Sequence, residues 1–528
     1  MRAHGTLASV IVGTLLIANP LAAQPAAEAL GKVTFETSCS PEAQAAFNRG
    51  MLFQHSFWYR ASQRSFENAL KADPQCGIAY WGIALSLLWN PHLPPPPRNL
   101  AAGASALDKA ANAVPKTERE RDYLAALGEM YKDFENVPHG QRVQNYLKAM
   151  ERLATKYPND DEAQIFYGLV LNTSASPADK TYAQQLKGAA LLEKIWERQP
   201  DHPGIAHYLI HLYDVPALAE KGLVAARRYA KVAPDSPHAL HMPSHIFTRV
   251  GYWQDSIDSN LASARVAKQD SEYTDQLHAM DYLVYAYLQL GQDAKARAVI
   301  DEMLAVQGFN DAAMPGPFGI AASPARYAVE RNDWKEAAAL EVRETQQLHV
   351  KAISWFAKGL GAARIGDVAA ADAAILKLQE LQSLLASKND AYWAGQVAIQ
   401  LQSAGAWTLF AKGRRDDALS MMQQAVEAED KTEKSPVTPG PLAPARELLG
   451  TMLLEIGKPQ DALAAFEAVM RKEPNRLNTM LSAATAAQAA GDKAKARQYY
   501  EAAVLQAKGE GVDRPELVKA RAFVAAPK

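Results

Sequence analysis

The stretch ARELLGTMLLEIGKPQDALAAFEAVMRKEPN, residues 445–475, decides the fold of this chain. It contains two helical segments separated by a glycine turn, with small residues where the segments would touch, an aromatic residue in the second segment and a closing proline. A step of 34 residues along the chain finds the same residue classes again, at Ala484, Gly491, Ala496 and Tyr500. One such unit cannot bury its apolar face alone, so the period predicts stacked helix pairs that share a continuous core.

Earlier copies of this unit cover most of the chain. They lie at 62–74, 80–90, 146–158, 187–200, 284–300, 324–340, 359–376 and 405–425. The period resembles the tetratricopeptide repeat, and HSFWY (55–59), DPQC (73–76), AYWG (79–82) and HMPSHIF (241–247) resemble a group of exported bacterial proteins built from that repeat. The resemblance implies an all-α, right-handed superhelical solenoid of antiparallel helix pairs with an interaction surface, and it implies no activity.

The expected domain order follows from the repeats and their interruptions. We expect a signal peptide at 1–23, a main repeat array with insertions at 40–430 whose histidine-rich repeats span 202–292, a proline-rich joint at 431–444, and two C-terminal repeats at 445–508. The proline-rich PHLPPPP (91–97) interrupts the second repeat.

Composition excludes some classes of partner. The 528 residues are 48% apolar and 22% charged, with a formal net charge of −2. Because no long-range positive field favours a phosphate backbone, nucleic acid is not an expected partner.

The N-terminal sequence predicts export. Arg2 precedes the apolar run LASVIVGTLLIA (7–18), which is short for a membrane span, and small residues near Ala23 offer a cleavage site. An uncleaved membrane anchor is the alternative. We expect a periplasmic or secreted protein without stable membrane insertion, in which Cys39 and Cys76 form a disulfide; two free thiols are the alternative.

Histidines cluster in two consecutive repeats. His207 and His211 lie four residues apart in HYLIH, and His241 and His245 occupy the same positions 34 residues later in HMPSH. Side chains four apart on a helix have Cβ atoms about 5–6 Å apart, and packed helices lie about 8–10 Å apart, so four imidazoles could share a pocket. Imidazoles without a thiolate suit Zn, Cu or Fe.

The candidate site residues fall into two sets. The expected metal ligands are His207, His211, His241, His245 and Asp281. In the repeat family the first helix of each pair lines the concave groove, and this resemblance adds groove residues His238, His278, Tyr285, Asp214, Arg249 and His55.

Several interpretations stay open. The histidines could hold a metal used for binding or for chemistry on a small substrate, line a groove that binds a peptide or partner helix without metal, or form a buried ladder without a ligand. A metal-dependent hydrolase or oxygenase is a further alternative, whereas Tyr208 and Met242 stand where zinc peptidases of the HExxH type need glutamate. Pro243 either kinks one helix that starts at Pro237 or begins a new helix.

Overall fold

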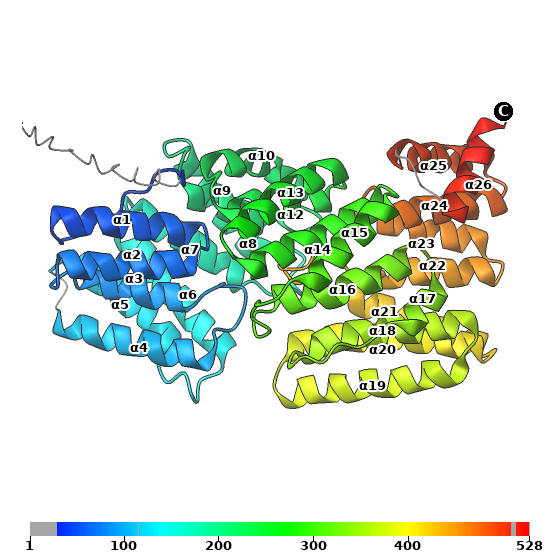
Figure 1. Ribbon diagram of the computed structural model, residues 1–528, viewed down its shortest axis with the longest axis horizontal. Helices are drawn as coiled ribbons and strands as arrows, with labels where there is room; N and C mark the ends of the chain where they lie inside the picture. The colour runs from blue at the N-terminus through cyan, green and yellow to red at the C-terminus, as the bar shows by residue number, and fades with distance from the viewer. Residues whose placement is uncertain (1–28, 114–115, 508–513, 527–528) are drawn as a thin grey trace, which may run out of the picture.

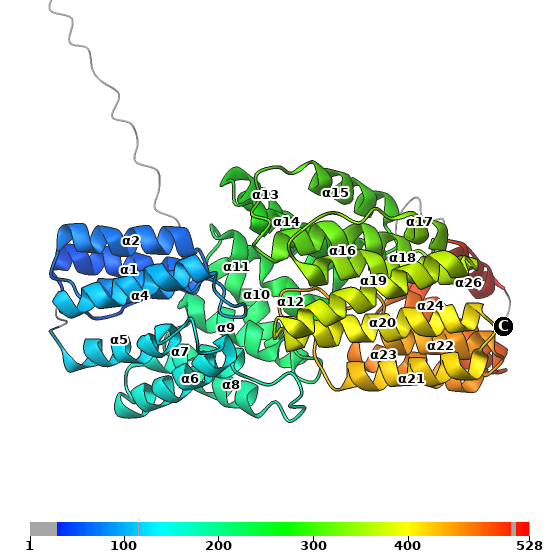
Figure 2. The ribbon, with the colours of Figure 1, turned by 90° about the horizontal axis from the view of Figure 1, so that it is seen from below.

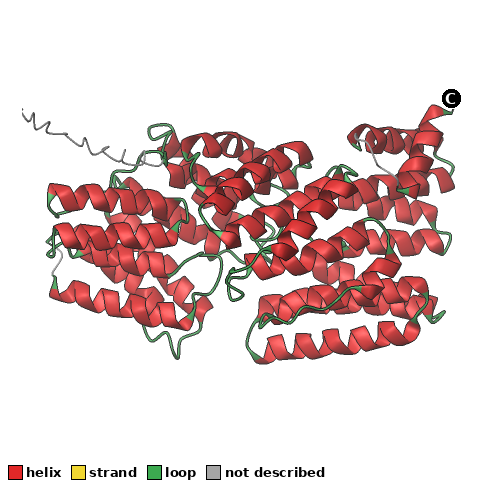
Figure 3. Ribbon diagram, in the orientation of Figure 1, coloured by secondary structure: helices red, strands yellow, loops and turns green. Residues whose placement is uncertain are grey.

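A computed structural model describes residues 29–113, 116–507 and 514–526 of the chain, and within these ranges it contains helices and no strand (Figure 3). The prediction of an all-α array of antiparallel helix pairs is confirmed. The helices of the first half are α1 (Pro41–His55), α2 (Tyr59–Ala72), α3 (Ile78–Leu87), α4 (Pro97–Asn112), α5 (Glu118–Tyr131), α6 (His139–Lys156), α7 (Asp161–Thr173), α8 (Ala183–Trp196), α9 (Pro203–Tyr213), the short 3-10 helix η1 (Ala219–Gly222), α10 (Leu223–Val232), α11 (Pro237–His241), α12 (Pro243–Arg249), α13 (Trp253–Gln269), α14 (Tyr273–Gln289) and α15 (Asp293–Ala305). Those of the second half are α16 (Pro315–Glu330), α17 (Trp334–Ala339), α18 (Leu348–Ile365), α19 (Val368–Ser387), α20 (Ala391–Ala411), α21 (Arg415–Asp430), α22 (Ala445–Glu455), α23 (Pro459–Lys472), α24 (Leu477–Ala489), α25 (Lys493–Gln506) and α26 (Pro515–Ala525).

Contacts between large and small residues hold the helix pairs together. In the C-terminal repeats, a Cβ added to Gly450 in α22 would lie 2.7 Å from the ring of Phe466 in α23, so only glycine allows this close approach. The turns between paired helices use glycine with positive φ, as at Gly457 (φ 77°) and Gly491 (φ 83°). The residue classes that set the sequence period are therefore the ones that the packing requires.

The helix pairs stack along an elongated molecule (Figure 1). Helices α1 to α7 lie at one end and α17 to α26 at the other, with α9 to α15 between them, and Figure 2 shows the same order from below. The array also contacts itself across a long sequence distance. Arg476, at the start of α24, pairs with Glu330 of α16 (2.6 Å) and donates to the hydroxyl of Tyr285 in α14 (3.1 Å). These buried contacts fix the C-terminal repeats against the middle of the chain.

Pro243 divides one helical segment into two. Ser236 caps α11 by accepting from the amide of Ala239, with Pro237 at the first helical position, as its residue type predicts. Pro243 then begins α12 because it has no amide to donate to the preceding turn. Met242 between the two helices keeps right-handed helical angles (φ −52°, ψ −36°), so the chain continues in nearly the same direction.

The proline-rich segment 431–444 packs inside the molecule. Ser435, Val437, Thr438, Leu442 and Ala443 are buried. Side chains from several repeats bind the segment's main-chain oxygens: Lys180 binds Thr432 O (2.7 Å), Tyr392 binds Glu433 O (3.0 Å), Tyr282 binds Thr438 O (3.2 Å), and Arg326 binds Gly440 O (3.2 Å) and Pro441 O (2.9 Å). All four side chains belong to the main array, so the segment that we expected to join two parts of the chain is bound along its main chain by the first of them.

The predicted signal peptide, residues 1–23, lies outside the described residues. Among the residues that the structure describes, no helix is both long and apolar enough to cross a membrane.

Candidate metal centre

Three short helices and one long helix bring the histidines together. Helix α9 carries His207 and His211, α11 carries His238 and His241, α12 carries His245, and α14 carries His278. Their ligand atoms form two groups: His241, His245 and His278 make one, and His207, His211 and His238 make the other. Within each group all ligand atoms lie within 4.8 Å of one another. We call these groups the first and second histidine triads.

In the first triad two ring nitrogens face each other directly. Nε2 of His241 lies 3.0 Å from Nε2 of His245. The Nδ1 atom of His241 lies 2.6 Å from Oδ1 of Asn260, whose own Nδ2 donates to Ser256 O (2.7 Å) and so fixes the amide orientation. Because Oδ1 can only accept, the Nδ1 of His241 carries the proton and its Nε2 carries a lone pair.

The tautomer of His245 is fixed in the same way. Its Nδ1 lies 3.0 Å from Oδ2 of Asp214, which also accepts from Lys434 Nζ (3.0 Å), while Oδ1 accepts from Arg249 Nε (2.8 Å). Burial alone would raise the pKa of Asp214, but the two cations outweigh it and hold that pKa well below the usual range. The carboxylate is therefore charged, the Nδ1 of His245 donates to it, and the Nε2 of His245 also carries a lone pair.

Burial keeps the imidazoles neutral. His241 and His245 are each 2% exposed. Burial lowers the pKa of both rings and lowers that of His278 to about 3. Neutral imidazoles with free lone pairs are the form that binds a metal ion, so this triad needs no deprotonation step near neutral pH.

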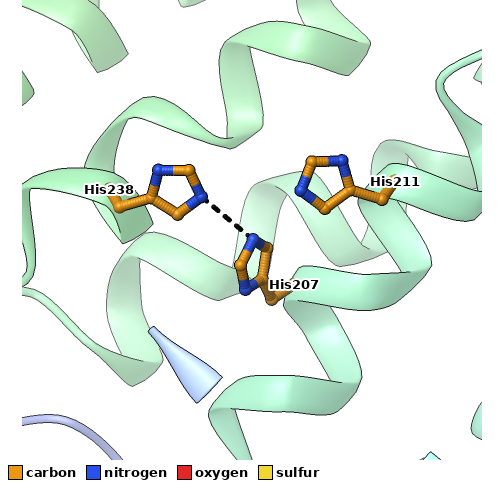
Figure 4. Close-up of side chains that lie close together, drawn as sticks. All are labelled: His207, His211 and His238. Carbon is orange, nitrogen blue, oxygen red and sulfur yellow. Dashed lines mark hydrogen bonds between the residues drawn. The ribbon is translucent and has the colours of Figure 1, made fainter. Parts of the chain in front are cut away.

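The second triad is close to the first. Nδ1 of His207 donates to His55 O (2.7 Å), which leaves a lone pair on Nε2, 3.0 Å from Nε2 of His238. The three rings point toward one another (Figure 4). The two triads touch through ring pairs: the centroids of His211 and His245 are 5.7 Å apart, and those of His238 and His241 are 6.2 Å apart.

A third buried cluster surrounds Glu162. His55 Nε2 lies 3.0 Å from one carboxylate oxygen and His202 Nε2 lies 2.9 Å from the other. His55 Nδ1 also pairs with the hydroxyl of Tyr208 (3.0 Å). The predicted groove residue His55 therefore belongs to a hydrogen-bonded cluster inside the array, where Gly204 leaves the space that its ring needs.

Two further predicted residues, Asp281 and Tyr285, neither belong to a triad nor make a hydrogen bond to a triad histidine within the described part of the chain. Asp281 is buried toward α16, where its Oδ1 accepts from Ser323 Oγ (3.3 Å), and burial raises its pKa to about 6. Tyr285 is buried and its hydroxyl contacts Glu473 (3.4 Å) and Arg476 (3.1 Å). Asp281 thus does not join the histidines with which we grouped it, because its carboxylate is directed toward Ser323 of α16.

Sequence reasoning missed residues that orient or accompany the histidines: Asn260, Lys434, Glu162 and His92. Asn260 lies on α13 without a motif, and Lys434 comes from the distant proline-rich segment. His92 lies in the proline-rich interruption of the second repeat, 4.4 Å from His211 between ring centroids. Insertions into a regular repeat were the signal available for Lys434 and His92.

The two cysteines are joined. Cys39 and Cys76 form a disulfide with Cα atoms 4.9 Å apart. Cys39 lies just before α1 and Cys76 just before α3, so the bond ties the first two helix pairs together.

An open cavity lies beside the Asp214 network. Arg249 and Lys434, which hold Asp214, are in its wall, together with Tyr392, Trp393 and His349. His349 stacks on Trp393 with ring centroids 4.0 Å apart, and its buried Nε2 has no hydrogen-bond partner among the residues described.

Comparisons with known proteins agree with the repeat pattern. The profile of the tetratricopeptide repeat family matches residues 447–512, and no curated protein matches the chain. Similar solved structures include a human IFIT1 dimer with m7Gppp-AAAA (12% identity, TM-score 0.38, covering 90% of this chain and 97% of that chain). They also include the APC/C hetero-tetramer Cut9-Hcn1 (13% identity, TM-score 0.30, covering 91% of this chain and 96% of that chain). The P58(IPK) TPR domain is a third (13% identity, TM-score 0.22, covering 91% of this chain and 98% of that chain). The family match therefore covers the C-terminal helix pairs, where the sequence period is clearest.

Proposed function

We propose that this chain is an exported helical-repeat protein that binds a transition metal ion through His241, His245 and His278. One observation carries the proposal. The two facing Nε2 atoms of His241 and His245 are 3.0 Å apart, and both rings use their Nδ1 atoms as donors. Two lone pairs at this distance repel each other unless a cation lies between them.

The spacing suits a metal ion. Two nitrogens at about 2.0–2.1 Å from a tetrahedral zinc ion lie about 3.3 Å apart, close to the observed 3.0 Å. A proton shared by the two rings would also relieve the repulsion, but it would charge a buried imidazole, and burial lowers the pKa of both rings. Asn260 and Asp214 would then act as the outer partners that orient metal-binding histidines.

The donor set defines a class of metal. Three neutral imidazoles without thiolate suit Zn, Cu or Fe. Export is supported by the apolar N-terminal run and by the disulfide, since disulfides persist in oxidising compartments.

Metal analysis of the purified protein tests the proposal. We expect the protein, reconstituted with Zn²⁺ or Cu²⁺ and then desalted, to retain metal that the double variant His241→Gln/His245→Gln loses. His349→Gln is the matched control, because it also changes a buried imidazole but lies outside the triads. Equal metal content in the double variant and the wild type would refute the ligand assignment.

A second candidate function is the binding of an extended partner segment. It is favoured by the way the inner face already binds the main-chain oxygens of 431–444, next to the cavity that Trp393 lines. Repeat solenoids commonly bind peptides along such faces. Selection of displayed peptides on the wild type and on Trp393→Ala tests this function. Peptide sequences that are enriched on the wild type and not on the variant would support peptide binding in the cavity. If the wild type enriches no such sequence, peptide binding in the cavity is refuted.

A further inference from the structure

The second histidine triad contains a buried ring that makes no hydrogen bond to the residues that the structure describes. His211 is 7% exposed, and neither its Nδ1 nor its Nε2 has a hydrogen-bond partner among the described residues. A buried polar group without a hydrogen-bond partner destabilises the fold. A neutral imidazole always has one donor and one acceptor. In His211 neither the donor nor the acceptor makes a hydrogen bond to a described residue.

The neighbours of His211 supply further nitrogen ligands. His207 directs a free Nε2 lone pair into the same space, because its Nδ1 donates to His55 O (2.7 Å). His238 faces it from the adjacent repeat, and all three rings point toward one another (Figure 4). His92 adds a fourth ring, whose buried Nε2 also has no hydrogen-bond partner within the described part of the chain.

An aromatic side chain covers this triad. The ring of Phe57 lies 4.3 Å from that of His207, 5.9 Å from that of His211 and 5.1 Å from that of His238, measured between centroids. Phe57 takes a positive φ of 55°, which is uncommon for a bulky residue. Such outliers persist only where the surroundings hold them, and this one places an apolar ring over the three imidazoles.

We infer that His207, His211 and His238 form a second transition-metal site, with His92 beside it. The site stands on its own residues; its pairing with the first triad into a two-metal centre rests on the proposed function. The ring centroids of His211 in one triad and His245 in the other are 5.7 Å apart. Two ions bound in the two triads would therefore be close enough to interact. An ordinary hydrogen bond from His238 to His207 would satisfy those two rings, but it leaves both nitrogens of His211 unpartnered.

Copper titration distinguishes the sites. Protein freed of metal with a chelator is loaded with Cu²⁺, and bound copper is counted for the wild type, His211→Gln/His238→Gln and His241→Gln/His245→Gln. We expect two equivalents in the wild type and one in each double variant. A half-field signal in electron paramagnetic resonance, which requires two interacting Cu²⁺ ions, should occur in the wild type and disappear in both variants.

Each other outcome has a defined meaning. One equivalent in the wild type that only the His241 and His245 changes remove would overturn the second site and leave the proposed function intact. One equivalent that only the His211 and His238 changes remove would support the second site and overturn the proposed function. No bound copper in the wild type would overturn both. If His211→Gln/His238→Gln fails to fold, His238→Gln alone replaces it, because His238 is only half-buried, and unchanged copper binding in that variant would count against the second site.

Discussion

Replacing Asp214 with Asn should weaken metal binding at the first triad without removing a ligand. Asp214 accepts from His245 Nδ1, Lys434 and Arg249, all three of them donors. An asparagine can accept at only one of its two terminal positions. If its amide nitrogen faces His245, the imidazole moves its proton to Nε2 and loses the lone pair that binds the metal.

The expected loss of affinity follows from this change of tautomer. Outer partners of metal-binding histidines typically contribute a factor of about 10–100 in affinity. At about 1.4 kcal/mol for each factor of ten, this is about 1.4–2.8 kcal/mol. The same substitution leaves Lys434 and Arg249 without their buried counter-charge, which costs about 3–5 kcal/mol of folding free energy.

Two further variants separate affinity from stability. In Asp214→Asn/Lys434→Met one unpaired cation is removed, so we expect part of the unfolding free energy to return while metal affinity stays low. Asp281→Asn is the matched control, because Asp281 is a buried aspartate that lies outside both triads. Competition with a chromophoric chelator gives the affinity, and urea unfolding of the metal-free protein gives the stability. The reasoning is wrong if Asp214→Asn binds the metal as tightly as Asp281→Asn does.

Three other predictions concern stability. Burial raises the folded-state pKa of Asp281 to about 6, above its ordinary value of about 3.9. The unfolding free energy should therefore fall by about 3 kcal/mol as pH rises from about 4 to about 6. Asp281→Asn should abolish this slope in urea titrations at several pH values. Gly450→Ala, whose Cβ would lie 2.7 Å from an aromatic ring, should lose about 1–3 kcal/mol in urea unfolding, whereas Gly395→Ala, with no atom within 4 Å, should lose nothing. Reduction should lower the unfolding free energy by about 4 kcal/mol, since Cys39 and Cys76 are separated by 37 residues, and a Cys39→Ser/Cys76→Ser variant should show no such response to reductant.

The sequence period predicts the fold and the faces of the helices, because packing itself requires the small and aromatic residues that define the period. It places His207 with His211 and His241 with His245 at equivalent positions, and the structure brings all four rings to one region. The grouping differs from the expectation. Each triad takes its third ring from the helix of the following repeat, His238 in one and His278 in the other. Spacing along the chain cannot reveal this, because the relative rotation of neighbouring pairs decides which side chains meet.

The outer partners were beyond sequence reasoning for a different reason. Asn260 and Lys434 have ordinary neighbours in the sequence, and their roles depend on contacts across 19 and 220 residues respectively, from Asn260 to His241 and from Lys434 to Asp214. A periodic pattern reports the local environment of a residue, whereas the Asn260 contact depends on how α13 packs against α11 and the Lys434 contact on how the array closes around segment 431–444.

The depth of the first triad limits what a metal ion there could do. Catalytic zinc sites keep one coordination position open to water or substrate, whereas structural sites are closed. His241 and His245 are each 2% exposed, and Arg249, Lys434 and Asp214 stand between His245 and the open cavity. A substrate in that cavity would contact Arg249 and Lys434, and it would be linked to the metal only indirectly, through the Asp214 carboxylate. This arrangement favours an ion that is held in the array over one that activates water for a hydrolytic reaction, and it makes the hydrolase alternative the least supported of those that the sequence left open.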